Sequence, residues 1–256
     1  MNRFGFFLVL LVAASVGLLA LTQAPRAQER VQTDFTPRQE EQIEALVRQY
    51  ILTNPEIISE AVAELQRRKV SEALASYRPQ LEVPFPGAEA GNPEGDVTIV
   101  EFFDYRCPYC RKSHQDLKRL IAEDRNLRVI YRELPILDQP NAEPLSRRAS
   151  LAALAAARQG RYNELHNALF TLPGRITQES LVAATRSVNL DEKRLAADMN
   201  HADLEAELNK NLQLAANLGL TGTPTYVIGD QIISGAVDYQ TLKDAIAKAR
   251  TAKAGK

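Results

Sequence analysis

The chain has 256 residues, of which 45% are hydrophobic and 25% charged, as in a soluble globular protein with one sizeable core and a smaller appended element. The formal net charge at pH 7 is −1, so nothing suggests a polyanionic partner, and we predict no binding to nucleic acid. Two cysteines in a chain of this size do not by themselves indicate an oxidising or a reducing compartment.

Residues 1–27 are predicted to be a secretory signal peptide. Arg3 gives a positive start, an apolar run follows from Phe4 to Leu21, and the exit is polar and contains alanine. An uncleaved membrane anchor is the alternative, because a run of about 18 residues is near the lower limit for crossing a bilayer. We favour cleavage, and in both cases we expect export to a compartment where a cysteine pair can cycle as a disulfide.

Residues 28–78 are predicted to form an N-terminal helical segment. Thr36 reads as an N-cap, with proline at the first helical position and Gln39 placed to close a capping box. Asn54–Pro55 repeats the signal for a second helix, which runs to about Tyr77. Each helix has one apolar stripe. Because a segment this small cannot bury both stripes, they must pack on the main domain or on copies of themselves.

Residues 79–96 are rich in proline and glycine without periodicity, and they are predicted to be a linker. The main domain, 97–256, begins with a buried strand, "VTIVEFF". Beyond it the pattern predicts a helix, a strand, a long helical block, a two-stranded hairpin and a closing helix, over residues 111–122, 127–136, 142–218, 225–234 and 238–249.

The two cysteines stand where the first strand of this domain gives way to a helix. Pro108 suits the first helical position, which places Cys107 near the N-cap, beside free N–H groups and the positive end of the helix dipole. Such a setting favours the thiolate and lowers a cysteine pKa. Cys110 lies one turn further along the same face, within reach of a mixed disulfide on Cys107. We therefore predict Cys107 as the outer nucleophile and Cys110 as the inner resolving thiol.

Two structural alternatives to redox chemistry are weaker. A disulfide between Cys107 and Cys110 closes too short a loop to constrain the unfolded chain much. A closed zinc site needs about four Cys or His ligands. The three histidines, His114, His166 and His201, are scattered, and we expect them to be surface or core residues. No metal or other cofactor is predicted beyond the redox-active disulfide itself.

Glu101 interrupts the apolar strand six residues before Cys107. It is either a solvent-facing side chain on an edge strand or, if the strand is central, a buried carboxylate near the cysteines. In the second case it would exchange the proton of Cys110, with a pKa raised by desolvation. Asp104 is a weaker candidate, expected to be exposed at the strand end.

A remote stretch, "TGTPTYVIG", places Pro224 directly before a strand. Most X-Pro bonds are trans, with about 5% cis in folded proteins. A cis bond would turn the backbone of Thr223 outward, ready to pair with an extended substrate.

Taken together, "EFFDYRCPYC" and "GTPTYVIG" resemble the DsbA-like branch of the thioredoxin superfamily. The resemblance implies an α/β thioredoxin fold with a helical domain inserted at about 142–218, here preceded by the N-terminal helical segment. It also implies that Cys107 is the nucleophile, Cys110 the resolving thiol, Pro224 a cis-proline preceded by Thr223, and Glu101 a buried acid.

The front segment is similar to that of suppressor-of-copper-sensitivity protein C and related Com1-like proteins. This likeness implies a periplasmic protein disulfide isomerase that assembles, as a trimer, through residues 36–77. Implied partners are unfolded or misoxidised secreted proteins and a membrane redox partner that resets the dithiol. The alternatives are a DsbA-type dithiol oxidase and a periplasmic Cu(I)-binding protein, since soft thiolates suit Cu(I).

Overall fold

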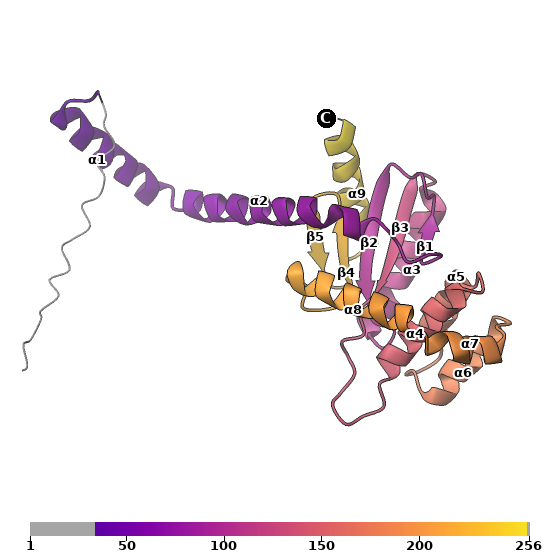
Figure 1. The fold of residues 1–256 in the computed structure, drawn as a ribbon. Coiled ribbons are helices and arrows are strands. Elements are labelled where there is room, and N and C mark those ends of the chain that lie inside the picture. Colours follow the sequence, from indigo (N-terminus) through magenta and orange to yellow (C-terminus); the bar gives the residue numbers. More distant parts are fainter. Residues whose placement is uncertain (1–33, 255–256) are drawn as a thin grey trace, which may run out of the picture. The chain divides into compact units, whose positions relative to one another are not determined.

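The structure, a computed structural model, describes residues 34–254, so the predicted signal peptide lies outside the described residues. The chain divides into two compact units, residues 1–55 and 56–256. In the described part the first unit holds one helix, and the second holds a sheet and the other helices (Figure 1). The elements are α1 (Pro37–Thr53), α2 (Glu56–Leu81), β1 (Glu89–Gly91), β2 (Val97–Phe103), α3 (Pro108–Glu123), β3 (Leu127–Glu133), α4 (Leu145–Ala157), α5 (Tyr162–Thr171), α6 (Gln178–Ser187), α7 (Glu192–Met199), α8 (Ala202–Asn217), β4 (Thr225–Ile228), β5 (Gln231–Ser234) and α9 (Tyr239–Ala254).

The start of α1 confirms the predicted capping box. The Thr36 side chain accepts a hydrogen bond from the Gln39 N–H, and the Gln39 side chain accepts one from the Thr36 N–H. Together they satisfy two of the orphan donors of the first turn. The helix ends at Asn54, and no residue of α1 is buried within its unit.

The predicted linker at 79–96 is wrong in two places. Helix α2 continues to Leu81, through Pro79, and residues 89–91 form the edge strand β1, which pairs antiparallel with β3. A strand of three residues is too short to show an alternating pattern in the sequence. Gly91 has φ +78°, and a Cβ there would lie 2.3 Å from the Leu127 carbonyl oxygen, so glycine is required where these strands meet.

The five strands form one mixed sheet in the order β1-β3-β2-β4-β5 (Figure 1). Strand β2 is parallel to β3 and antiparallel to β4, so it has a neighbour on each side. The sequence alone left open whether β2 was an edge strand. Its central place explains the nearly continuous apolar run, because both faces of the strand are covered.

Helices cover both faces of the sheet. On one face α3 and α9 pack over β2, β3 and β4, and on the other α2 and α8 pack against the sheet. The second face has its own core cluster, in which Leu74 and Leu81 of α2 and Leu214 of α8 lie on strand residues. The C-terminal half of α2 therefore belongs to the folded core and is not a separate segment.

The helical block between β3 and β4 runs from α4 to α8, residues 145–217, close to the predicted 142–218. The stretch from Asp191 to Gly219 is two helices, because the chain turns at Asn200, whose side chain donates to the Ala196 carbonyl at the end of α7. Across the described residues, we find no helix with the length and apolar character needed to cross a membrane.

Candidate active site

Cys107 is the N-cap residue of α3, as its place in the sequence predicts. Its backbone is extended, Pro108 is the first helical residue, and the Arg111 N–H donates to the Cys107 carbonyl. The sulfur therefore sits at the positive end of a 16-residue helix, where unpaired N–H groups favour a negative charge. Strand β2 ends at Phe103, and a short turn carries the chain to this position.

Cys110 lies one turn into α3 and is fully buried, whereas Cys107 keeps 4% of its surface exposed beside the exposed Tyr109. Both cysteines are reduced in the structure. A substrate sulfur can thus approach Cys107 but not Cys110. The arrangement agrees with an outer nucleophile and an inner resolving thiol.

The two thiols differ sharply in acidity. The pKa of Cys107 is lowered to about 6, first by the adjacent Cys110 thiol and then by Thr223 and the N–H groups of Cys110 and Tyr109, with burial opposing them. The pKa of Cys110 is raised well above its usual range, by burial first and then by Cys107 and the Glu101 carboxyl. Near neutral pH, Cys107 is the thiolate and Cys110 keeps its proton.

Glu101 is buried in the middle of the sheet, 1% exposed, and the edge-strand interpretation is wrong. It stands opposite Tyr131 of β3 and Tyr226 of β4. Burial, and secondarily the charge on Cys107, raises the pKa of its carboxyl to about 8, against a lowering by Tyr226. A carboxyl with this pKa exchanges a proton readily near neutrality.

The loop before β4 brings a second backbone segment to Cys107. The Thr223–Pro224 peptide bond is cis. In its protonated form the Cys107 thiol donates to the Thr223 carbonyl oxygen at 3.2 Å, although 116 positions separate the two residues. The Pro224 carbonyl accepts from the Gly235 N–H, which anchors the loop to the end of the hairpin. The Thr223 N–H has no partner among the described residues, so it is available to an extended peptide.

Asp104 is buried, and the expectation that it would be exposed is wrong. Its carboxylate accepts from the Arg106 N–H at 2.8 Å and the Leu137 N–H at 3.0 Å, so it fixes the turn before Cys107. Burial raises its pKa. The histidines include two core residues, as expected: His114 and His166 are buried 5.2 Å apart between ring centroids, while His201 is exposed.

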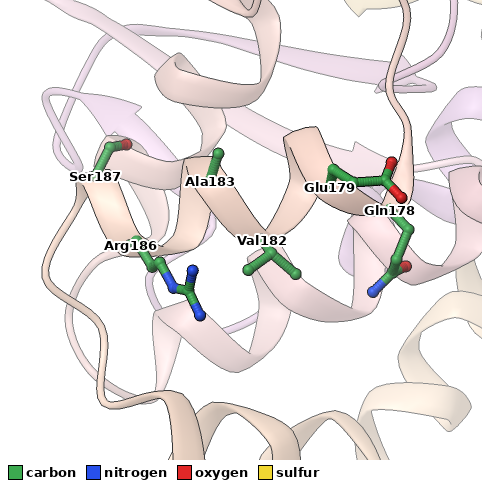
Figure 2. A pocket seen from close by; sticks show the side chains of 6 residues that line it. All are labelled: Gln178, Glu179, Val182, Ala183, Arg186 and Ser187. Atoms are coloured by element: carbon green, nitrogen blue, oxygen red, sulfur yellow. The ribbon is translucent and has the colours of Figure 1, made fainter.

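Outside the cysteine site, a ligand could be bound by a cluster of metal-ligating side chains or in a hollow. The described residues contain no group of three or more His, Cys, Asp and Glu side chains that could hold a metal ion. A hollow of about 690 Å³ lies along one face of α6, but its lining comes from that helix alone and includes none of the predicted site residues (Figure 2). A groove of about 400 Å³ beside Pro108 is a different case, because it adjoins the cysteine pair.

Two family models match the chain in different places. The DSBA-like thioredoxin domain matches residues 98–247, which include the cysteines, Glu101 and the cis-proline loop. The chain belongs to this family. It is a family of thiol–disulfide oxidoreductases. The copper resistance protein ScsC N-terminal domain matches residues 39–70.

Solved structures support the same assignment. A thioredoxin-like oxidoreductase from Silicibacter pomeroyi DSS-3 is 41% identical, with a TM-score of 0.61 over 65% of this chain and 94% of that one. Proteus mirabilis ScsC in a transitional conformation is 30% identical, with a TM-score of 0.63 over 85% of this chain and 99% of that one. The resemblance inferred from the sequence is confirmed for both the family and the fold.

A curated relative is a Na(+)/H(+) antiporter NhaA 1 from Salinispora arenicola, 27% identical over 62% of this chain. The match spans only 24% of the antiporter's length. The likeness is therefore confined to a part of that longer protein.

The sequence did not reveal the surroundings of Glu101. Tyr226 is two residues after Pro224, but only strand pairing shows that it faces Glu101. Tyr131 is likewise an unremarkable member of an apolar strand. Once β2 is taken as the central strand, the residues paired with Glu101 on the two neighbouring strands are Tyr131 and Tyr226.

Proposed function

We propose that this protein is a thiol–disulfide oxidoreductase that acts on secreted proteins through Cys107 and Cys110, and that its main activity is disulfide isomerisation. The observation that carries the proposal is the opposite shift of the two pKa values within one helical turn. It leaves one accessible thiolate and one protected thiol, which is the division of roles that exchange chemistry requires.

In isomerisation the Cys107 thiolate attacks a substrate disulfide. A mixed disulfide forms between Cys107 and one substrate sulfur, and the other substrate sulfur leaves as a thiolate. A further substrate thiolate then attacks the bound sulfur and forms a new substrate disulfide, which releases Cys107 as thiolate. One substrate disulfide is broken and another is formed, so there is no net oxidation or reduction and the dithiol is unchanged at the end of the cycle.

In oxidation the protein starts as the Cys107–Cys110 disulfide. A substrate thiolate attacks Cys107 and releases Cys110, which takes up a proton. Glu101 is the group we assign to that transfer, because it is buried near Cys110 and raises the pKa of that thiol. A second substrate thiolate then attacks the substrate sulfur of the mixed disulfide and releases Cys107, which leaves the reduced dithiol. A membrane redox partner would reoxidise this dithiol to the Cys107–Cys110 disulfide.

Substrate would bind along the cis-proline loop. The free Thr223 N–H and the proximity of its carbonyl to Cys107 support pairing with an extended chain beside the reacting sulfur. Main-chain pairing of this kind accepts many sequences, which suits a protein that acts on diverse unfolded substrates.

The choice of isomerase over oxidase rests on self-assembly through residues 36–77. Apolar side chains form one exposed stripe on α1 and another on the first half of α2, and exposed apolar stripes of this kind mark contact surfaces. We propose a homo-oligomer, with a trimer favoured, because several sites around one cleft can hold a single misoxidised substrate. The exposed side chains are Ile43, Leu46, Val47, Tyr50, Ile58, Val62 and Leu65.

The reaction is tested by refolding of scrambled ribonuclease with the reduced protein. We expect recovery of ribonuclease activity, loss of that recovery in Cys107→Ser, and accumulation of a mixed disulfide in Cys110→Ser. No recovery with the wild-type protein refutes the isomerase proposal. If the disulfide form of the protein instead oxidises reduced ribonuclease, the oxidase alternative holds. Tight Cu(I) binding with neither activity favours the copper-binding alternative, which the description of the ScsC N-terminal domain supports.

Assembly is tested by mass in solution. Leu46→Lys places a charge in the stripe on α1 and is expected to shift the protein toward monomer. Val83→Lys is the matched control, since Val83 is a similarly exposed apolar residue outside both stripes. Equal masses for the two variants and the wild type would refute assembly through this surface.

A further inference from the structure

The groove beside Pro108 begins at the redox centre and has no role in the mechanism above. Its seven lining residues come from the turn before α3, the start of α3, the segment after β3 and the segment between α5 and α6: Arg106, Pro108, Arg111, Leu137, Gly174, Arg175 and Ile176. Arg106 and Pro108 are the covalent neighbours of Cys107. Any chain joined to Cys107 through a disulfide therefore passes close to this groove.

The charged side chains that line the groove are all positive. Three of the lining residues are arginines, and no aspartate or glutamate lines it within the described part of the chain. Arg106 pairs with Asp138 at 3.2 Å, while Arg111 donates to the Leu172 carbonyl, which carries no formal charge. Arg175 is exposed and has no ion pair or hydrogen bond to any described residue. Two guanidinium charges are thus left without a carboxylate partner.

Two of the guanidinium groups are already held in place. Asp138 accepts from the Ser146 and Arg147 N–H groups, so the partner of Arg106 is itself fixed at the start of α4. The bond to the Leu172 carbonyl holds Arg111 across to the end of α5. Preorganised donors reduce the entropy cost of binding, and a guanidinium presents a fork that fits a carboxylate.

The distances also suit a peptide. An extended chain advances about 3.3–3.6 Å per residue, so residues within about three positions of a cysteine bonded to Cys107 reach the groove. Leu137 and the buried Ile176 supply an apolar part, against which the stem of a glutamate can lie. No acidic side chain of the described residues lines the groove, so a lysine or arginine of the substrate would find no ion-pair partner there.

We propose that this groove selects substrates that carry aspartate or glutamate within about three residues of the reacting cysteine. The inference rests on the proposed exchange at Cys107 and adds the substrate class to it. The occupant is an acidic stretch of an unfolded polypeptide. Arg175, which has no ion pair or hydrogen bond among the described residues, is the residue whose charge is most available to it.

The test uses the full-length reduced protein and peptide disulfides of one backbone sequence. The two residues flanking the cysteine are Asp and Glu, Asn and Gln, or Lys and Lys. At low salt we expect kcat/KM for the acidic peptide to exceed that for the neutral one about tenfold, with the lysine peptide slowest. The preference is expected to shrink as salt screens the charges.

Arg175→Gln is expected to lower the acidic-to-neutral ratio severalfold. Arg125→Gln is the matched control: it removes the same charge from an exposed arginine at the far end of α3, and the ratio should stay at its wild-type value. A wild-type ratio near one, or an unchanged ratio in Arg175→Gln, overturns the groove assignment. Failure of the wild type on all three peptides instead overturns the proposed exchange activity, so the two failures are distinct.

Discussion

At the scale of single residues, the site depends on one thiol lowering the pKa of another. The largest cause of the low pKa of Cys107 is Cys110, its neighbour one turn along α3, and the helix start and Thr223 add to it. Cys110 keeps its proton because it is buried near Glu101. The nucleophile therefore owes much of its reactivity at neutral pH to the resolving thiol beside it.

Alkylation of Cys107 by iodoacetamide measures this dependence. In the wild type we expect the rate to rise through a midpoint near pH 6, because the thiolate is the reacting form and the pKa is about 6. Cys110→Ala should move the midpoint upward, toward the ordinary thiol value. Cys110→Ser keeps a small hydrogen-bond donor at the same place and should shift it less. A midpoint that stays near 6 in both variants would show that the helix start and Thr223 are sufficient to lower the pKa of Cys107.

Glu101 gives a second prediction at this scale, one that concerns stability. Its pKa is about 8 in the folded protein against 4.5 as the ordinary value, so the unfolded chain loses its proton first. A raised carboxyl pKa therefore costs stability as pH rises from 4.5 to 8, and the cost at pH 7 is about 3 kcal/mol. Glu101→Gln removes the ionisation and should be more stable than the wild type by about that amount.

The difference between Glu101→Gln and the wild type should vanish near pH 4 and reach its maximum above pH 8, in urea unfolding of the reduced protein. Exposed Glu60→Gln is the control and is expected to follow the wild type. A constant difference at every pH would mean that packing, and not ionisation, accounts for the gain.

At the scale of elements, Arg132 of β3 fastens α2 and α8 to the sheet. It is fully buried, donates to the carbonyls of Gln80, Leu81 and Val83 at the end of α2, and pairs with Glu207 of α8 at 2.7 Å. Carbonyls at a helix end lack partners within the helix, so a guanidinium that collects them acts as a cap. It also explains why α2 ends where it does, just after Pro79.

Arg132→Met is expected to lower the free energy of unfolding by about 3–5 kcal/mol. It leaves the carbonyls at the end of α2 without their donor, and the mostly buried Glu207 carboxylate keeps only the exposed Lys210 as a cation. Arg119→Met is the matched control. Arg119 pairs with Glu123 across one turn of α3, but both side chains are exposed, so the loss should be below about 1 kcal/mol. Chemical denaturation of both variants measures the difference. Equal losses would contradict the role given to Arg132.

Much of this element-scale structure could be predicted from the sequence. The capping box at Thr36, the strand ending before Cys107 and the hairpin at 225–234 all have local signals, and each is confirmed. Strand β1 and the C-terminal end of α2 were missed because long-range partners, β3 and Arg132, define them. The burial of Glu101 followed only from family resemblance, since a single strand does not reveal its neighbours.

At the scale of the whole molecule, the core unit begins at the first residue of α2, but the side chains of that helix enter the core only in its second half. The first half of α2 carries exposed apolar side chains, and the second half supplies Leu74 and Leu81 to the core. A prediction of domain limits from composition placed the boundary after residue 78. Packing places the start of the core unit at Glu56 and its first buried α2 side chain at Leu74.

Three truncations test this placement. Removal of residues 1–69 should leave a folded unit, because every buried side chain of α2 is retained. Removal of residues 1–81 should cost at least about 3–6 kcal/mol, since two buried leucines are worth about 1.5–3 kcal/mol each and Arg132 also loses the Gln80 and Leu81 carbonyls. Removal of residues 1–55 gives the reference, with all of α2 in place. Urea unfolding at low protein concentration gives the comparison, and equal stability of all three would contradict the packing of α2 on the sheet.

The strand order allows the helical block between β3 and β4 to differ among related proteins while the sheet stays the same. The inserted helices leave the sheet at the end of β3 and return at the start of β4, on either side of β2. These two points are two strand spacings apart, about 10 Å. A block that spans this gap can replace 135–222 without altering strand register, provided that it covers the same face and supplies partners for Asp104 and Arg132 in place of Leu137 and Glu207. Exchange of the block between relatives would then graft a new peptide preference onto an unchanged pair of thiols.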